Sequence, residues 1–371
     1  EGVVRVLRVD CFAGRRAGVV MDMKRDYYED VRLFESGVVL SWTVAFLVLV
    51  FSLPLFVPKY HFYLLNLLLV HVILAVGLNI LVGYTGQISL GHAGFFAIGS
   101  YGTALLMLKL QMPFLLALPL SGFIAAFFGF ILGLPALRLE GPYLSIATLG
   151  FGLTVMQVIG HWDFFGGRTG IQVPPLDLCF GFILKSDVSK YYLILVITVI
   201  LVIGARNLMK TRVGRAFVAI RDSDIAAEVI GVNLTIYKTL SFAISAFYAG
   251  ISGGLFGFVL GFFNPEPFNL ILSIIFLVMI VVGGLGSILG SILGASLITV
   301  LQFSLLKNIG EKPILGDFLV SVSKQWFTVV GLENFNSIIL GLVMIGIVIF
   351  EPLGMYGVWL RMKKYWRTWP F

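Results

Sequence analysis

Long apolar runs follow one another along most of this chain, and they limit its fold more than any other feature. Each is roughly 20 residues long, the length that an α-helix needs to cross the hydrocarbon core of a bilayer. Because lipid offers no partners to backbone polar groups, such runs predict membrane-spanning helices and not open sheets. About ten spans are expected, at residues 38–57, 61–82, 90–109, 114–135, 143–160, 190–207, 237–261, 269–284, 286–306 and 336–355. The predicted fold class is all-α, a polytopic membrane helix bundle.

The composition excludes a soluble globular domain. Of the 371 residues, 59% are hydrophobic and only 12% are charged, whereas soluble domains have about 25% charged residues. The net charge of +7 does not indicate nucleic-acid binding, because the basic residues gather in tails and in one loop. Cys11 and Cys179 fall on opposite sides of the predicted membrane, so no disulfide is expected, and the four scattered histidines predict no metal site.

The distribution of charge predicts the orientation of the chain. Alternation of the spans places Arg212, Arg215 and Arg221 on the same side as the basic C-terminal tail, as the positive-inside rule requires. Both termini are therefore expected in the cytoplasm. The predicted parts are a cytoplasmic tail (1–37, of which 1–20 lie upstream of a plausible start at Met21), a transmembrane domain (38–360) with external loops 161–189 and 307–335 and a cytoplasmic loop 208–236, and a basic cytoplasmic tail (361–371).

A polar, glycine-rich stretch interrupts the apolar pattern near residue 83. It comprises Gly83, Gly86, Gln87, Ser89, Gly91 and His92. Irregular backbone at membrane depth is tolerated only where protein or a watery cavity satisfies it, so one interpretation is a broken helix that lines a transport pathway. The other is a tight turn followed by a packing face of small residues at Ala93 and Ala97. Both interpretations stay open, and His92 is a candidate either for the pathway or for a structural hydrogen bond.

A second glycine cluster, Gly283, Gly284 and Gly286, has the same pattern as the first. Two such interruptions in corresponding halves predict an internal structural repeat with the pathway between the halves. The junctions near 135–142 and 284–286 fit either loops or re-entrant helix breaks. The further residues expected in close helix packing are Gly253, Gly257, Gly261, Gly290 and Gly294.

Between residues 208 and 236 the chain becomes basic and amphipathic. Its charges keep it in water, yet apolar residues are interleaved with them. Asp222, Ser223 or Asp224 can each cap a short helix, and Gly231 can end it. A short surface helix with an apolar side suits docking into a groove of a soluble partner, and the alternative is a packed loop without a partner.

The motifs that the chain lacks indicate where its energy comes from. It contains no G-x-x-x-x-G-K-[ST] phosphate loop and no Ser/His/Asp or Cys/His arrangement, so we expect neither an ATPase nor another enzyme, and no bound cofactor. Carriers driven by protons or sodium usually keep carboxylates inside their spans. The few ionisable residues in the predicted spans therefore favour a transporter whose energy is supplied by another subunit.

Six blocks of sequence are distinctive: GYTGQISLGHAGFFAIGSYGTALL (83–106), RLEGPYLSIATLGFG (138–152), GGRTGIQVPP (166–175), GRAFVAIRDSDIAAEVIGVN (214–233), FNPEPFNLILSI (263–274) and VVGGLGSILGSILGA (281–295). In this order, over roughly residues 38–360, they resemble the LivM-type permeases, the membrane subunits of bacterial branched-chain amino acid ABC importers.

The resemblance implies a non-enzymatic permease subunit in the cell inner (cytoplasmic) membrane. Its implied partners are a LivH-type sister permease, two cytoplasmic ATPase subunits that bind ATP-Mg, a periplasmic or extracellular solute-binding protein, and membrane lipid. The implied ATPase-docking residues are Arg215, Phe217, Arg221, Asp222, Ala226, Ala227, Glu228 and Gly231. The chain departs from the family pattern at Ile225, where the docking signature has a glutamate, and at Leu153, where relatives often have an acidic residue.

Two alternatives remain. An ABC importer permease for urea, short amides or other amino acids would share this pattern. A channel or secondary carrier that works without ATP is the alternative from another class, and flux through the isolated chain would identify it.

Overall fold

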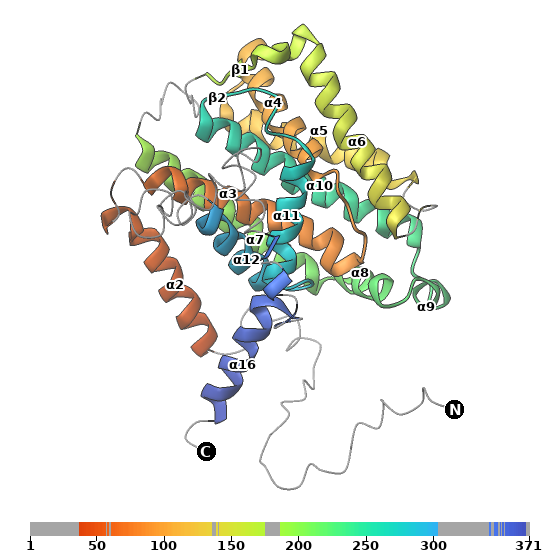
Figure 1. Ribbon diagram of the computed structural model, residues 1–371. Coiled ribbons are helices and arrows are strands. Elements are labelled where there is room, and N and C mark those ends of the chain that lie inside the picture. Colours follow the sequence, from red (N-terminus) through yellow and green to blue (C-terminus); the bar gives the residue numbers. More distant parts are fainter. Residues whose placement is uncertain are drawn as a thin grey trace, which may run out of the picture. The chain divides into compact units, whose positions relative to one another are not determined.

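The computed structural model describes residues 37–302, except 57, 59–60, 136–138, 140 and 175–185, together with parts of 341–368 (Figure 1). The chain divides into two compact units, residues 1–47 and 48–371, and the contacts below are those of the second. Residues 1–36, the predicted external loop 307–335 and much of the tenth predicted span lie outside the described residues.

The described elements are almost all helices. In chain order they are α2 (Gly37–Phe56), α3 (Phe62–Asn79), the π-helix η2 (Ile80–Tyr84), α4 (His92–Leu110), α5 (Phe114–Gly133), α6 (Pro142–His161), η4 (Asp163–Phe165), η5 (Gly167–Thr169), β1 (Ile171–Gln172), α7 (Asp187–Lys210), α8 (Arg212–Asp222), α9 (Asp224–Val229), α10 (Leu234–Leu260), β2 (Phe262–Phe263), α11 (Leu270–Gly283), α12 (Ile288–Val300) and α16 (Gly354–Thr368).

Within the described part of the chain, six helices are long and apolar enough to cross a membrane. They are α3 with η2, α4, α5, α6, α7 and α10, and each lies at a predicted span. The chain is thus a polytopic helical membrane protein. Helix α11 has only 14 residues, which corresponds to about 21 Å at 1.5 Å per residue and falls short of a hydrocarbon core about 30 Å thick. Its bounds agree with those of the eighth predicted span, 269–284, to one residue at each end.

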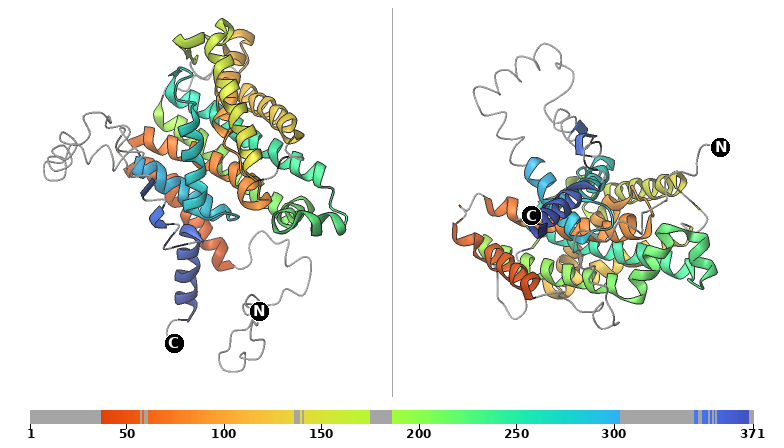
Figure 2. Two further views of the ribbon diagram at one scale, coloured as in Figure 1. Left: turned by 45° about the vertical axis from the view of Figure 1, so that its right-hand side comes forward. Right: turned by 90° about the horizontal axis from the view of Figure 1, so that it is seen from below.

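Helix α10 packs against α3, α4 and α5, and small residues let these backbones approach closely (Figures 1 and 2). A Cβ atom at Gly99 would lie 2.0 Å from the carbonyl oxygen of Gly250, and one at Gly253 would lie 2.0 Å from that of Phe96. The hydroxyl of Ser100 donates to the Gly253 carbonyl at 2.7 Å. Without a hydrophobic driving force between helices in lipid, such close contacts and interhelical hydrogen bonds hold a bundle together.

One predicted packing residue has a different role. Gly261 caps the C-terminus of α10 in the left-handed conformation with φ +74°. No atom lies within 4 Å of the position its Cβ would take. The prediction of close packing is therefore wrong for Gly261, because glycine is needed here for its backbone conformation, as at many helix ends.

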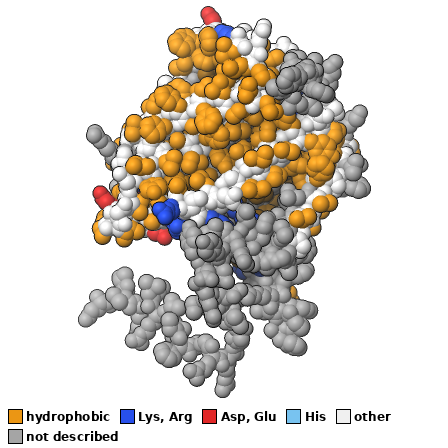
Figure 3. Space-filling view, turned by 180° about the vertical axis from the view of Figure 1, so that it is seen from behind, with side chains coloured by type: hydrophobic (Ala, Val, Ile, Leu, Met, Phe, Trp, Pro, Cys, Tyr) orange, Lys and Arg blue, Asp and Glu red, His pale blue; other side chains and the backbone are white. Residues whose placement is uncertain are grey.

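Apolar side chains cover much of the face of the bundle that Figure 3 shows, as expected for contact with lipid. At one end, β1 pairs antiparallel with β2, which joins the segment after α6 to the segment after α10. At the other end lie α8 and α9, beside the start of α10 (Figure 1). The candidate functional site is at this second end.

Candidate functional site at the α8–α9 end

Helix α8 is amphipathic. Its buried residues Gly214, Phe217 and Ile220 recur every three residues, so they share one face, while Arg212 and Arg215 are exposed. The Phe217 ring is fully buried and meets the Tyr237 ring of α10 edge-on at 6.3 Å. The apolar face thus attaches α8 to the bundle and leaves its cationic face in water.

Helix α9 is a short helix with a defined cap at each end. At its start the Ser223 side chain accepts a hydrogen bond from the Ala226 N–H. At its end Gly231 has φ +88°, its N–H donates to the Glu228 carbonyl, and the Val232 N–H donates to the Ala227 carbonyl. This pair of bonds is a Schellman motif, which ends a helix at a left-handed glycine.

Helix α9 and the residue after it expose three large aliphatic side chains beside Glu228. Ile225, Val229 and Ile230 are 78%, 81% and 74% exposed. Ala227, by contrast, is 1% exposed. Of the predicted docking residues, Ala227 and Phe217 are therefore buried within the chain and cannot contact a partner in this structure. The sequence predicted a short helix with an apolar side, but these three aliphatic residues were not among the predicted docking residues.

An ion pair fixes α9 to the bundle. The ammonium group of Lys238, near the start of α10, lies 2.5 Å from the Asp224 carboxylate, and the lysine side chain is only 10% exposed. A charge pair with a largely buried lysine is screened less by salt than a surface pair. The ion pair therefore links the start of α9 to the start of α10.

The first glycine-rich stretch is a break between two helices. The π-helix η2 ends at Tyr84, and α4 begins at His92. His92 is fully buried, and its two ring nitrogens lie 3.0 Å from the Ser89 hydroxyl and 2.7 Å from the Ser245 hydroxyl. Gly91 packs so closely on Thr148 that a Cβ would lie 2.1 Å from the threonine carbonyl. In this structure His92 makes structural hydrogen bonds, and its role in a pathway stays a prediction.

The second glycine cluster separates α11 from α12. Gly284 and Gly286 have φ +118° and +74°, conformations that L-residues with a side chain rarely adopt. Ser287 then caps α12 by accepting from the Gly290 N–H. The two short helices cross closely, since a Cβ at Gly294 would lie 2.1 Å from the Met279 carbonyl.

Asn79, at the end of α3, joins the two breaks. Its side-chain nitrogen donates to the Ser287 carbonyl at 2.9 Å and lies 2.6 Å from the Ser291 hydroxyl, and its side-chain oxygen accepts from the Gly286 N–H at 3.0 Å. Asn79 is 1% exposed, so these bonds satisfy a buried polar group. Gly83 leaves space for this side chain, because a Cβ there would overlap the Asn79 amide.

Arg221, near the end of α8, contacts the first helix break beside Asn79 and Gly83. Its Nη1 donates to the Gly83 carbonyl at 3.1 Å, and its Cγ lies 3.3 Å from the position that a Gly86 Cβ would take. Its other nitrogens contact the Asp222 carboxylate at 3.1 and 3.2 Å. We call Asn79, Gly83, Arg221 and Gly286 the coupling node. Gly83, Arg221 and Gly286 were each predicted as site residues from the sequence, whereas Asn79 and the contacts among the four were not.

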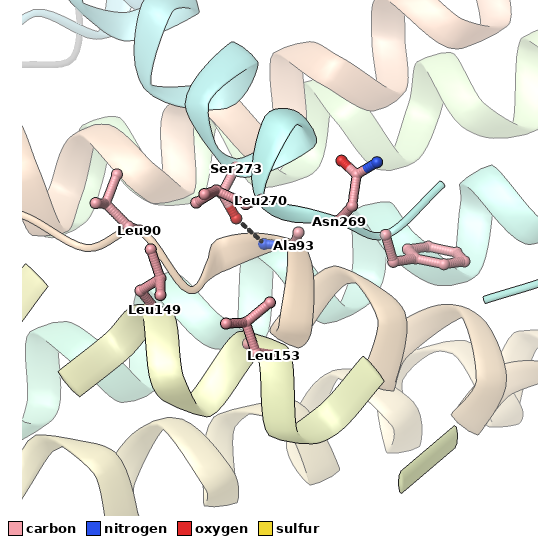
Figure 4. Close-up of a pocket in the computed structure, with 9 residues that line it drawn as sticks. Leu90, Ala93, Leu149, Leu153, Asn269, Leu270 and Ser273 are labelled. Carbon is pink, nitrogen blue, oxygen red and sulfur yellow. Dashed lines mark hydrogen bonds between the residues drawn. The ribbon is translucent and has the colours of Figure 1, made fainter. Parts of the chain in front are cut away.

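A small pocket lies on another side of the bundle, between α4, α6 and α11 (Figure 4). Leu149 and Leu153 of α6 point toward Leu90 and Ala93, and the Ser273 hydroxyl accepts from the Ala93 N–H at 3.0 Å. Its volume of about 10 Å³ is close to the minimum for one water molecule. The pocket is therefore too small for an amino acid in this structure.

Long apolar helices, helix contacts through small residues and an amphipathic helix pair at one end define a multi-pass membrane protein of the transporter type. The chain belongs to the family described as branched-chain amino acid transport system / permease component, whose model matches residues 60–348.

Its relatives carry names in agreement with that family. It is 36% identical over 296 residues to the LivM high-affinity branched-chain amino acid transport permease protein of Escherichia coli, covering 73% of this chain and 69% of that protein. It is 35% identical, with the same coverage, to the LivM protein of Salmonella typhimurium. It is 29% identical over 309 residues to a probable LivH permease protein of Methanocaldococcus jannaschii, covering 79% of this chain and 90% of that protein. No solved structure matches the chain.

Proposed function

We propose that this chain is a permease subunit of an ABC importer that moves branched-chain, hydrophobic amino acids across the cytoplasmic membrane. The observation that carries the proposal is the family match over residues 60–348, together with the exposed apolar surface of α9. Relatives named for branched-chain amino acid transport support the substrate class. The chain itself acts as a transport subunit and not as an enzyme.

Its proposed partners follow from this class of importer. They are a sister permease, two ATPase subunits that bind ATP-Mg, and an external solute-binding protein. Helix α9 would dock in a groove of an ATPase subunit, because a short helix with exposed aliphatic residues is suited to such grooves. With this docking we propose that α8, α9 and both termini lie in the cytoplasm, and the basic residues of 208–236 and 361–371 support this orientation.

The mechanism that we propose is alternating access driven through the coupling node. When ATP closes the ATPase subunits, their grooves displace α9 and, through Lys238, the start of α10. Arg221 carries the same displacement to Gly83 and thus to the break before α4. Tightly packed helices change between discrete arrangements, so a small shift at α9 can switch the side to which the pathway opens.

Uptake by the reconstituted complex tests the proposal. Proteoliposomes with both permeases, the ATPases and the binding protein should accumulate labelled leucine when ATP is supplied to the ATPase side, and should not accumulate labelled urea. Uptake of urea without leucine would identify a related importer of another substrate. Flux of leucine through this chain alone, without ATPases, would contradict the importer mechanism.

A further inference from the structure

One face of α6 combines exposure with polarity along the C-terminal half of this candidate membrane span. Gly150, Thr154, Gln157 and His161 are all exposed. They recur at intervals of four, three and four residues, so they lie on one side of the helix. Thr154 is near the middle of the 20-residue helix, and Gln157 is about one turn further along. We call these four residues the polar face of α6.

The exposed faces of the neighbouring long helices differ from this one. On α5, the exposed side chains include Phe123 and Phe127, which are 63% and 62% exposed, and every exposed residue of this helix is apolar. Along the middle of α7, the exposed side chains of Val196 and Ile200 are also apolar. These faces have the composition that contact with hydrocarbon requires.

Not every polar side chain on this face has a hydrogen-bond partner among the described residues of the chain. The Thr154 hydroxyl donates to the Gly150 carbonyl at 2.8 Å, and the His161 Nδ1 donates to the Gln157 carbonyl at 2.9 Å. The side-chain amide of Gln157 makes no hydrogen bond among the residues that the structure describes. A carboxamide without partners is costly in hydrocarbon, so this face needs water or another polar group against it.

We propose that the polar face of α6 lines the water-filled path through which the amino acid moves. This inference rests on the proposed function, and it adds the residues of this chain that contact the solute. A branched-chain amino acid has an α-ammonium and an α-carboxylate group, which need hydrogen-bonding partners throughout the passage. The Gln157 amide offers both a donor and an acceptor, and the Thr154 hydroxyl offers the same.

An apolar residue beside the polar face of α6 can contact the aliphatic side chain of the amino acid. Leu153 is 44% exposed and lies beside the polar face, at the edge of the pocket between α4, α6 and α11 (Figure 4). An aliphatic side chain that slides along Leu153 would keep apolar contact while its zwitterionic head stays on Thr154 and Gln157. A polar strip beside an apolar strip therefore matches an amphiphilic amino acid better than it matches lipid.

Cysteine accessibility in the assembled complex tests this inference. After replacement of Cys11 and Cys179 by serine, single cysteines are introduced as Thr154→Cys and Gln157→Cys on α6, and as Phe127→Cys on α5 and Ile200→Cys on α7. The two control positions are equally exposed, at 62% each. Each variant is treated with a charged, water-soluble methanethiosulfonate and with a lipid-soluble maleimide, with and without leucine-loaded binding protein and ATP.

We expect Thr154→Cys and Gln157→Cys to react with the charged reagent about tenfold faster than the controls or more, because the reactive thiolate forms only in water. Transport of leucine should slow this reaction. Rates no faster than those of Phe127→Cys and Ile200→Cys would overturn the inference. So would protection from both reagents in the complex but not in the isolated chain, because that result identifies a dry contact with the sister permease.

The outcome also separates this inference from the proposed function. If the complex takes up another solute in place of leucine, the substrate assignment fails, yet the reactivity of Gln157→Cys still reports whether water reaches α6. If leucine is taken up and Gln157→Cys stays unreactive, the function holds and the pathway lies elsewhere.

Discussion

Arg221 of α8 and Gly83 of the π-helix η2 are 138 residues apart in sequence, and the arginine Nη1 donates to the glycine carbonyl at 3.1 Å. This hydrogen bond joins the segment proposed to dock with an ATPase to the helix break proposed to move. A backbone carbonyl at a break has no helical partner of its own, so it is available to the arginine. The bond connects α8 directly to the end of the candidate span formed by α3 and η2.

Loss of this contact should uncouple transport from ATP hydrolysis. We expect Arg221→Ala to lower leucine uptake about fivefold or more, while the ATPase rate stays within about twofold, because coupling between sites is typically worth 1–3 kcal/mol. The measured quantity is ATP hydrolysed per leucine transported. Arg212→Ala, at an exposed position at the start of the same helix, should leave this ratio unchanged. An unchanged ratio in Arg221→Ala would show that the contact carries no coupling.

The aliphatic residues of α9 should hold the ATPase. Ile225→Asp and Val229→Asp place a carboxylate where an apolar side chain would be buried against the partner. Central contacts of an interface are worth about 2 kcal/mol or more, so co-purification of the ATPase subunits should fall sharply. Ile225→Leu and Val229→Leu keep the apolar area and should bind normally. If the aspartate variants retained their ATPases, α9 would not be the docking element.

Asn79 should be important for stability. Asn79→Leu removes three hydrogen bonds and leaves the Gly286 N–H without its partner, while the Ser287 carbonyl still accepts from Ser291. Its expected cost is about 2–4 kcal/mol, because each bond contributes about 1 kcal/mol and stranded groups add to the loss. Thermal unfolding in detergent measures the effect.

Asn66 offers a matched control for this substitution on the same helix. It is 3% exposed, and its side-chain oxygen has no hydrogen-bond partner among the described residues. Asn66→Leu removes an unsatisfied group and should leave stability unchanged or raise it. If both variants lost stability equally, the cost would reflect burial of leucine at α3 and not the coupling node.

The crossing of α11 and α12 should tolerate no side chain at Gly294. Gly294→Ala puts a Cβ 2.1 Å from the Met279 carbonyl, and forced repacking of this kind costs about 1–3 kcal/mol. The control is Gly204→Ala in α7, where the nearest atom to the new Cβ is the Tyr248 hydroxyl at 3.6 Å. That variant should gain up to about 1 kcal/mol from helix propensity. Equal melting temperatures for the two variants would contradict the close crossing.

The positions of the long helices could be predicted from the sequence, but the contacts of the candidate site could be predicted only in part. Six predicted spans are long helices in the structure, since span length and hydropathy are local properties of the chain. The caps of α9 were also visible, because Ser223 and Gly231 act through their own backbone neighbourhood. The burial of Phe217 and Ala227 was not visible, because it depends on how α8 and α9 lie against α10.

The sequence by itself determined a chain of apolar helices with two glycine breaks and one amphipathic segment, because hydrophobic length, charge and backbone freedom are encoded residue by residue. The tertiary structure decided that both breaks meet at Asn79 and that Arg221 reaches them. Asn79 and Gly286 are 207 residues apart, and no local pattern specifies such a pairing. It follows from the packing of α3 against α11 and α12, where small residues let the backbones approach and a buried amide must find partners.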